Sequence, residues 1–111
     1  MELKVENVGD GSVIKVPGGS LEASNVEEFK QDILPILNES GRVVLDIKNL
    51  DFVDSSGLGA FLSCLRTLNA RGGDLKIAGM TKAVRALFEV VRMHRICDSF
   101  DTVDEATKAF E

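Results

Sequence analysis

The chain has 111 residues, of which 44% are hydrophobic and 28% are charged. This length predicts one domain over residues 1–111, and this composition disfavours intrinsic disorder. Thirteen Lys and Arg against eighteen Asp and Glu give a net charge of −5, which disfavours binding to nucleic acid or to anionic lipid headgroups. No apolar run approaches the roughly 18 residues that a membrane-spanning helix needs, so the sequence predicts no membrane insertion.

The cysteines and the first residues indicate the cellular compartment. No apolar segment of the kind found in secretory signals follows Met1, which predicts a cytoplasmic protein with reduced thiols. Cys64 and Cys97 lie 33 residues apart and outside any CxxC pattern. With a single histidine in the chain they offer no zinc set, so we expect no metal and no other cofactor.

The first elements predicted along the chain are a hairpin and a helix. Runs rich in β-branched residues over 3–8 and 13–16 flank the turn signal Gly9-Asp10-Gly11, which predicts two antiparallel strands. Ser24-Asn25-Val26-Glu27 fits a capping box and predicts a helix that ends at Ser40-Gly41. Pro35 lies inside this pattern, so we expect a kink or a break there.

A buried strand and a second helix are predicted in the middle of the chain. The continuous apolar run over 42–47 indicates a strand covered on both faces. Asn49 to Asp54 is interpreted as a loop that carries two acidic residues. A helix then starts around Ser56 with an apolar stripe over 58–68, and Gly72-Gly73 ends it where a C-cap needs positive φ.

The remaining third predicts one more strand, two helices and a short edge strand. Leu75 to Ala78 forms the strand, and Thr81 caps a helix that carries the apolar residues Val84, Leu87, Phe88 and Val91. Residues 96–100 form the edge strand, and Thr102-Val103-Asp104-Glu105 is a second capping box. This order predicts an α/β fold, with a mixed β-sheet, an N-terminal hairpin and about four helices packed on the sheet.

The segment Asp54-Ser55-Ser56-Gly57-Leu58-Gly59 breaks the local rules for a helix start. Two glycines in a first turn cost about 1 kcal/mol each relative to alanine, but glycine lets another backbone approach closely. An anion on Ser55 or Ser56 would be favoured by the helix dipole and free N–H groups. The carboxylates of Asp51 and Asp54 would repel it. This mixed environment suits a charge that is added and removed.

Other interpretations of the two serines remain open from the residues alone. Either serine can simply be an N-cap, because serine is a preferred capping residue. A nucleophilic serine needs a base, and the chain offers only His94, with no supporting motif and no G-x-S-x-G elbow. A phosphate-binding P-loop is disfavoured because G-x-x-x-x-G-K-[ST] is absent.

The run from Asn49 to Gly59 resembles the signature of the anti-sigma factor antagonists, which are free-standing STAS-domain proteins of bacteria. The resemblance covers nearly the whole chain, including the hairpin, the Gly72-Gly73 helix end, and Leu87-Phe88 of the third helix. It implies a STAS domain fold. It also implies that Ser55, the first serine of the pair, is phosphorylated by a partner kinase.

The same resemblance implies a role in partner switching rather than in catalysis, so no residue is assigned as catalytic. Unphosphorylated, the chain would bind an anti-sigma factor that is often itself the serine-protein kinase, and a PP2C-type phosphatase would reset it. The implied partner-binding residues frame Ser55 or lie on the adjacent docking loop: Ser20, Glu22, Ser24, Asp54, Ser56, Gly57 and Leu58.

One departure from the family pattern concerns the docking loop. The family often has G-E-L-D after the second strand, whereas this chain has Gly19-Ser20-Leu21-Glu22, which affects the identity of the partner and not the fold. Two alternatives come from other functional classes. One is a non-switching STAS scaffold subunit of a membrane transport or lipid-trafficking assembly, and the other is an enzyme that uses Ser55 as nucleophile.

Overall fold

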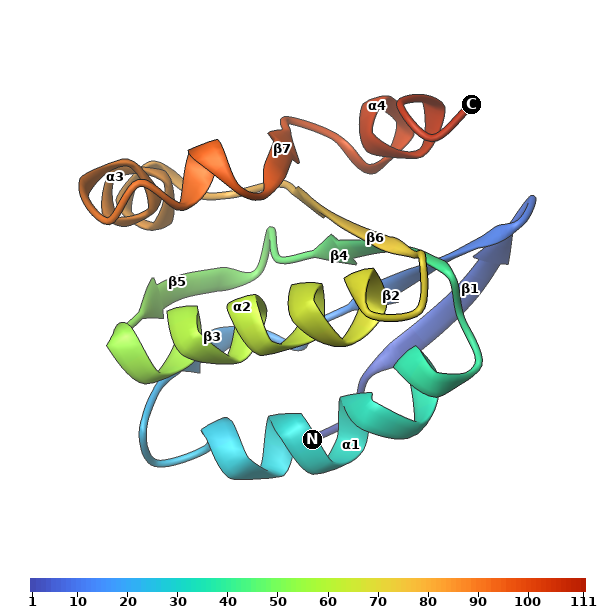
Figure 1. The fold of residues 1–111 in the computed structure, drawn as a ribbon. Helices are drawn as coiled ribbons and strands as arrows, with labels where there is room; N and C mark the ends of the chain where they lie inside the picture. Colours follow the sequence, from blue (N-terminus) through green and yellow to red (C-terminus); the bar gives the residue numbers. More distant parts are fainter.

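Five strands form the main sheet of the computed structural model, which describes all 111 residues (Figure 1). Their order is β1-β2-β4-β6-β7. The hairpin of β1 (Lys4–Val8) and β2 (Gly11–Lys15) is antiparallel, and every later pair is parallel. The other strands are β4 (Arg42–Asp46), β6 (Asp74–Ala78) and β7 (Asp98–Phe100). The predicted mixed sheet with an N-terminal hairpin is therefore confirmed.

Four helices pack around the strands. Helices α1 (Val26–Asn38) and α2 (Ser55–Asn69) lie side by side on one face, and the short α4 (Val103–Lys108) covers the other (Figure 1). Helix α3 (Lys82–Val90) continues into a 3-10 turn, η1 (Met93–Arg95). A core of 24 buried residues lies mainly under α1 and α2, and a cluster of four lies beneath α4. No helix is long and apolar enough to span a bilayer.

A second, two-stranded sheet was missed from the sequence. It consists of β3 (Gly19–Leu21) and β5 (Leu50–Val53), which pair in parallel. The interpretation of residues 49–54 as a loop is therefore wrong. The reason is physical: the burial of β5 does not alternate, since both ends are buried and both central residues are exposed. A period of two, which would indicate a half-buried strand, is therefore absent.

The start of α1 also differs from the prediction. Its N-cap is Asn25, and that side chain makes no capping hydrogen bond to the helix. Instead, Asn25 Oδ1 accepts from the Glu22 N–H at 2.9 Å, and Nδ2 donates to the Ser20 carbonyl at 2.9 Å. The capping box built on Ser24 is therefore wrong. The single amide side chain of Asn25 satisfies both a donor and an acceptor of the preceding turn.

Pro35 does not break α1, which runs through it as one element. Proline removes one helical hydrogen bond, here to the carbonyl of Gln31. Both residues are exposed, so water can take up that carbonyl. The opposite face of the helix is fully buried in the core, and this packing holds the helix together across the missing bond.

The predicted ends of the later helices are confirmed. Gly72 has a φ of +80° after the end of α2. The hydroxyl of Thr81 accepts from the Val84 N–H at 3.4 Å, and Thr102 accepts from the Glu105 N–H at 3.1 Å.

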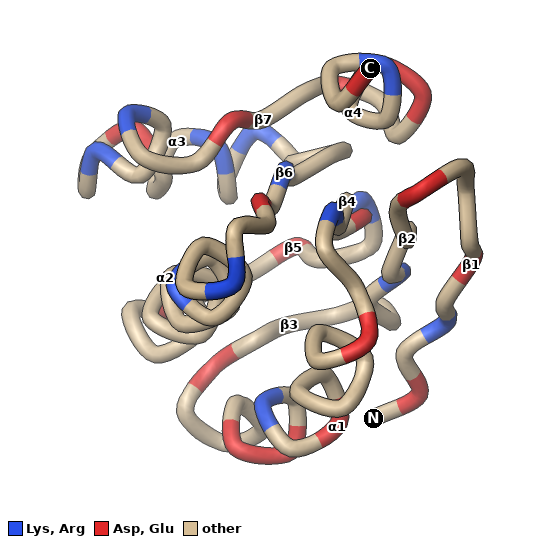
Figure 2. Tube along the Cα trace, turned by 45° about the vertical axis from the view of Figure 1, so that its right-hand side comes forward, with Lys and Arg blue, Asp and Glu red and all other residues tan.

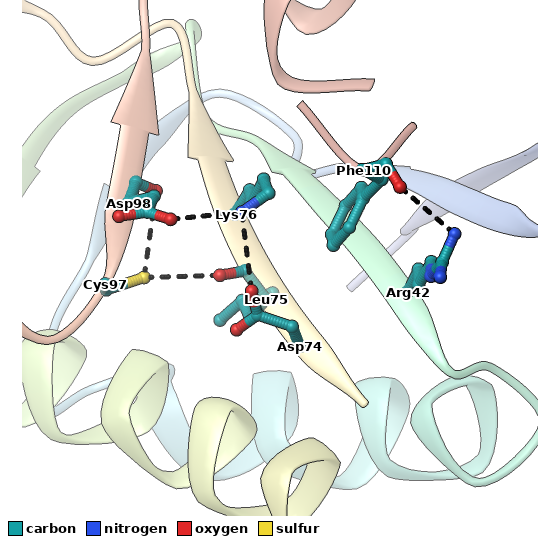
Figure 3. A network of polar contacts seen from close by, with 7 residues as sticks. All are labelled: Arg42, Asp74, Leu75, Lys76, Cys97, Asp98 and Phe110. Atoms are coloured by element: carbon teal, nitrogen blue, oxygen red, sulfur yellow. Dashed lines mark hydrogen bonds and ion pairs between the residues drawn. The ribbon is translucent and has the colours of Figure 1, made fainter. Parts of the chain in front are cut away.

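A polar network ties the C-terminal segment to the sheet (Figure 3). The buried Lys76 ammonium lies 3.0 Å from Asp98 Oδ2 and 3.4 Å from Asp74 Oδ2. It also lies 4.8 Å from the centre of the Phe110 ring. Burial lowers the pKa of Lys76, but the two carboxylates outweigh it and the pKa is raised. The Arg42 guanidinium donates to the Phe110 carbonyl at 3.1 Å, so β4 and β6 both hold the end of the chain.

The two cysteines are structural, as predicted. Both are buried and free, and burial raises the pKa of Cys64 and of Cys97 to about 12. Since the thiolate is the reactive form, neither thiol is activated.

Candidate functional site

Ser55 is the first residue of α2, at the end of the molecule where β5 passes into the helix (Figure 1). It is exposed, whereas Ser56 is half-buried. The amide groups of a helix's first turn have no partner within the helix, and the dipole is positive there. The position therefore offers an accessible hydroxyl in a setting that favours an attached anion.

Asp54, and neither serine, is the N-cap of α2. Its Oδ1 accepts from the Gly57 N–H at 2.9 Å, and its Oδ2 accepts from the Ala23 N–H at 3.0 Å. The interpretation of Ser55 or Ser56 as the N-cap is thus wrong. The Gly57 bond, joined by that of Ala23, holds the pKa of Asp54 below its usual value against the opposing effect of burial. One carboxylate therefore links the start of α2 to the β3–α1 connection.

The two glycines of the hexapeptide have different surroundings. Gly57 is buried, and a Cβ on it would lie 2.5 Å from the Leu21 carbonyl oxygen and 2.7 Å from Val53 Cγ1. The close approach predicted from the sequence thus holds for Gly57. Gly59 is exposed, and a Cβ there would meet nothing within 4 Å. Glycine in a helix costs about 1 kcal/mol relative to alanine, and the packing of this chain offers nothing that offsets it at Gly59.

The β3–α1 connection lies against the start of α2. The Ala23–Asp54 bond joins them, and the Asp54 N–H also donates to the Leu21 carbonyl at 3.2 Å. Glu22 is half-buried and Ser24 is exposed, with Ser24 Oγ 3.4 Å from Glu22 Oε1.

The residues assigned from the resemblance occupy two levels. An outer level is accessible at the surface, at least in part, and comprises Ser20, Glu22, Ser24, Asp54, Ser55 and Ser56. An inner level, Gly57 and Leu58, is buried and supports the outer level from beneath. No group of three His, Cys, Asp or Glu side chains is placed to hold a metal ion.

Phe52 is a surface residue that the sequence reasoning did not single out. It lies opposite Ser20 in the β3–β5 pairing, and 54% of it is exposed. The available signal was an aromatic residue between two acidic ones, three positions before Ser55. With residues 49–54 interpreted as a loop, an exposed aromatic residue there did not indicate a binding surface.

The two segments that form the site carry charge of one sign. Residues 16–29 and 49–65 contain no Lys or Arg. Figure 2 shows red segments and no blue ones along the β3–α1 connection and the first turn of α1. The acidic residues of the two segments are Glu22, Glu27, Glu28, Asp51 and Asp54. These two segments therefore contribute a negative potential to the surface around Ser55.

The capping role of Asp54 makes a prediction for pH dependence. Asp54→Ala should lower the melting temperature by several degrees at pH 7, because two backbone N–H groups lose their acceptor. Since the folded pKa is depressed, the stabilisation is complete above the unfolded pKa of 3.8 and is lost as pH falls through the folded pKa. In thermal melts between pH 7 and pH 2.5, the melting temperatures of Asp54→Ala and wild type should therefore come closer together as the pH falls.

The control for this prediction is Asp51→Ala, which removes an exposed acid of β5. It should leave the melting temperature nearly unchanged across the range. A difference between Asp54→Ala and wild type that stays constant down to pH 2.5 would contradict the assigned role.

Comparison with known proteins identifies the family. The sequence profile of the STAS domain matches residues 4–106. The anti-sigma-B factor antagonist of Staphylococcus aureus is 29% identical over 92 residues, which cover 81% of this chain and 85% of that protein. These matches confirm the resemblance inferred from residues 49–59.

Solved structures agree on the fold. A crystal structure of a Thermotoga maritima protein superposes with a TM-score of 0.89 at 22% identity, covering 96% of this chain and 92% of that one. The Bacillus cell fate determinant SpoIIAA in its phosphorylated form superposes with a TM-score of 0.72 at 23% identity, covering 99% of this chain and all of that one. Since the STAS profile spans nearly the full length, the chain belongs to the STAS domain family.

Proposed function

We propose that this protein is an anti-sigma factor antagonist whose partner binding is controlled by phosphorylation of Ser55. The observation that carries the proposal is the exposed Ser55 at the start of α2, with the β3–α1 connection fastened beside it by Asp54. The name of the Staphylococcus aureus relative, an anti-sigma-B factor antagonist, supports the same role. SpoIIAA, which shares the fold, has been solved in a phosphorylated form.

The proposed mechanism is a change of charge within a docking surface. Unphosphorylated, the outer level of the site binds an anti-sigma factor that is also the serine-protein kinase. Transfer of phosphate to Ser55 adds a charge of about −1.5 to −2 near neutral pH and releases the partner. A PP2C-type phosphatase removes the phosphate. The chain acts in the cytoplasm, as a single domain and without a cofactor.

The structure offers an argument against the alternative of an enzyme that uses Ser55 as nucleophile. The acidic neighbour Asp54 has both carboxylate oxygens engaged with backbone N–H groups, and its pKa is lowered. A carboxylate in this state is a poor general base. It serves as a structural link, which suits a phosphoacceptor better than a self-activated nucleophile.

The test combines binding and modification with purified serine-kinase anti-sigma factors of the source bacterium. Ser55→Ala should retain one of them in a pull-down and Ser55→Asp should not. The control is Asn69→Asp, which adds the same charge at the exposed far end of α2 and should bind like wild type. With ATP, mass mapping should place a single phosphate on Ser55.

Two results would overturn this proposal. One is a phosphate on Ser56 or elsewhere with Ser55 unmodified. The other is partner binding that does not depend on the charge at Ser55, with a component of a membrane transport or lipid-trafficking assembly as the partner. The second result would favour the scaffold alternative.

A further inference from the structure

Gly59 is a helix residue that the fold itself does not require. Gly57 in the same turn is needed, because Leu21 and Val53 leave no room for a side chain. Around Gly59 there is open space, and its φ lies outside the left-handed region where glycine is favoured. Alanine would be the better helix former at this position. A reason for glycine must therefore come from something outside this chain.

The position of Gly59 on α2 indicates that a binding partner is the reason for this glycine. Residues four apart lie on the same face of a helix, about 6 Å apart along its axis. Gly59 is thus the next exposed position after Ser55 on that face, and Ser63 follows it; all three are exposed. These three positions of α2 carry no long side chain, so the backbone of a partner can lie directly on the helix there.

Phe52 is the second, independent observation. Of the six phenylalanines, it is the one with more than a third of its surface exposed. It lies in β5 next to Ser20, on the other side of Ser55 along the chain. Aromatic residues that dominate binding energy typically fill a pocket of the partner near the centre of an interface. An exposed aromatic three residues before Ser55 and an exposed glycine four residues after it therefore flank Ser55 along the chain.

The charged residues near Ser55 indicate the chemistry of the binding partner. Residues 16–29 and 49–65 carry five acidic residues and no basic one (Figure 2). The amino group of Met1 engages the carboxylate of Glu28 at 2.6 Å, and Lys30 pairs with Glu27 at 3.7 Å, which leaves Glu22 and Asp51 without an ion pair. Complementarity across an interface then requires a basic surface on the partner.

We propose that Gly59 and Phe52 determine the specificity for a basic protein partner that handles Ser55. Phe52 fills an apolar pocket of that partner, and the partner's main chain lies against α2 at Gly59. This inference rests on the proposed function, because its partner is the serine-kinase anti-sigma factor.

The test measures affinity and stability together, with each purified serine-kinase anti-sigma factor of the source bacterium as the probe. Gly59→Ala should raise the melting temperature by about 4 °C and weaken binding at least tenfold. A residue with only a structural role would not give both effects. The control is Gly41→Ala, which fills open space at another exposed glycine, next to β4 and away from Ser55. It should leave the affinity unchanged.

Phe52→Ala should weaken binding at least tenfold with little change in melting temperature. Its control is Ile96→Ala, which removes an apolar side chain of the same exposed fraction, 54%, and should bind like wild type. Wild-type affinity of Gly59→Ala or of Phe52→Ala would overturn the role of that residue. If the wild-type chain binds none of the kinases, the proposed function fails, and this inference fails with it.

Discussion

Phosphorylation of Ser55 should weaken partner binding at least a hundredfold while α2 stays in place. The helix has little freedom to rearrange, because Leu58 and Phe61 in its first two turns are buried in the core. Within the free protein, the helix N-terminus stabilises the phosphate by roughly 0.3–1 kcal/mol, which offsets repulsion from Asp51 and Asp54.

The binding loss comes from the complex and not from the free protein. When a partner covers Ser55, water leaves, and an uncompensated buried charge costs several kcal/mol. Every 1.4 kcal/mol is a tenfold loss of affinity, so about 3 kcal/mol suffices for a hundredfold effect. Ser55→Asp should reproduce part of the loss, because it carries less charge than a phosphate. Ser55→Ala should stay bound in the presence of kinase and ATP.

A titration against the anti-sigma factor, combined with amide chemical shifts of the two forms, measures both parts of this prediction. Shifts should change around Ser55 and in the β3–α1 connection, and should be unchanged along the rest of α2. The charge control is again Asn69→Asp. Rearrangement of α2 in the phosphorylated form, or equal affinities of the two forms, would exclude the local mechanism.

Strong local signals in the sequence predicted most elements of the fold. The hairpin follows from a turn segment between two β-branched runs, and its Gly9 has a φ of +59°. Thr81 and Thr102 each precede an apolar helical pattern, and both cap a helix. In each case the residues that set the structure lie within a few positions of one another, so a short window contains the whole argument.

The elements that could not be predicted depend on partners far away in the chain. Strand β5 exists because β3 pairs with it, and neither strand has a pattern of its own. The start of α1 is set by the turn before it, where Asn25 binds Glu22 and Ser20. A capping motif in the sequence cannot show that another side chain has a better set of partners.

The candidate site was likewise predictable in part. Its position was predictable, because Asp54-Ser55-Ser56-Gly57-Leu58-Gly59 stands out in the sequence. The different roles of its members were not, since they depend on contacts with Ala23 and Leu21. From the sequence Gly57 and Gly59 are equivalent, and only the surroundings separate a glycine needed for packing from one with open space around it.

The different surroundings of Gly57 and Gly59 lead to the last prediction: alanine should have opposite effects on stability at these two positions. Gly57→Ala should destabilise the protein by about 1–3 kcal/mol, because the new methyl group overpacks against a backbone carbonyl and a buried valine. Gly59→Ala should stabilise it by up to about 1 kcal/mol through helix propensity alone. Urea denaturation of both variants measures the two free energies of unfolding, and equal effects would contradict the packing assigned to Gly57.

The consequence of Gly57→Ala should extend to the site, because the clash lies between α2 and β3. To relieve the clash, the start of α2 must move away from Leu21. Two hydrogen bonds join these segments, one from the Asp54 N–H to the Leu21 carbonyl and one from the Ala23 N–H to the Asp54 carboxylate, and the movement would weaken both. The β3–α1 connection would then lose its fastening beside Ser55. Hydrogen exchange should therefore show faster exchange at the Ala23 amide in Gly57→Ala than in wild type. In Gly59→Ala, which leaves both bonds intact, the exchange at Ala23 should stay as slow as in wild type.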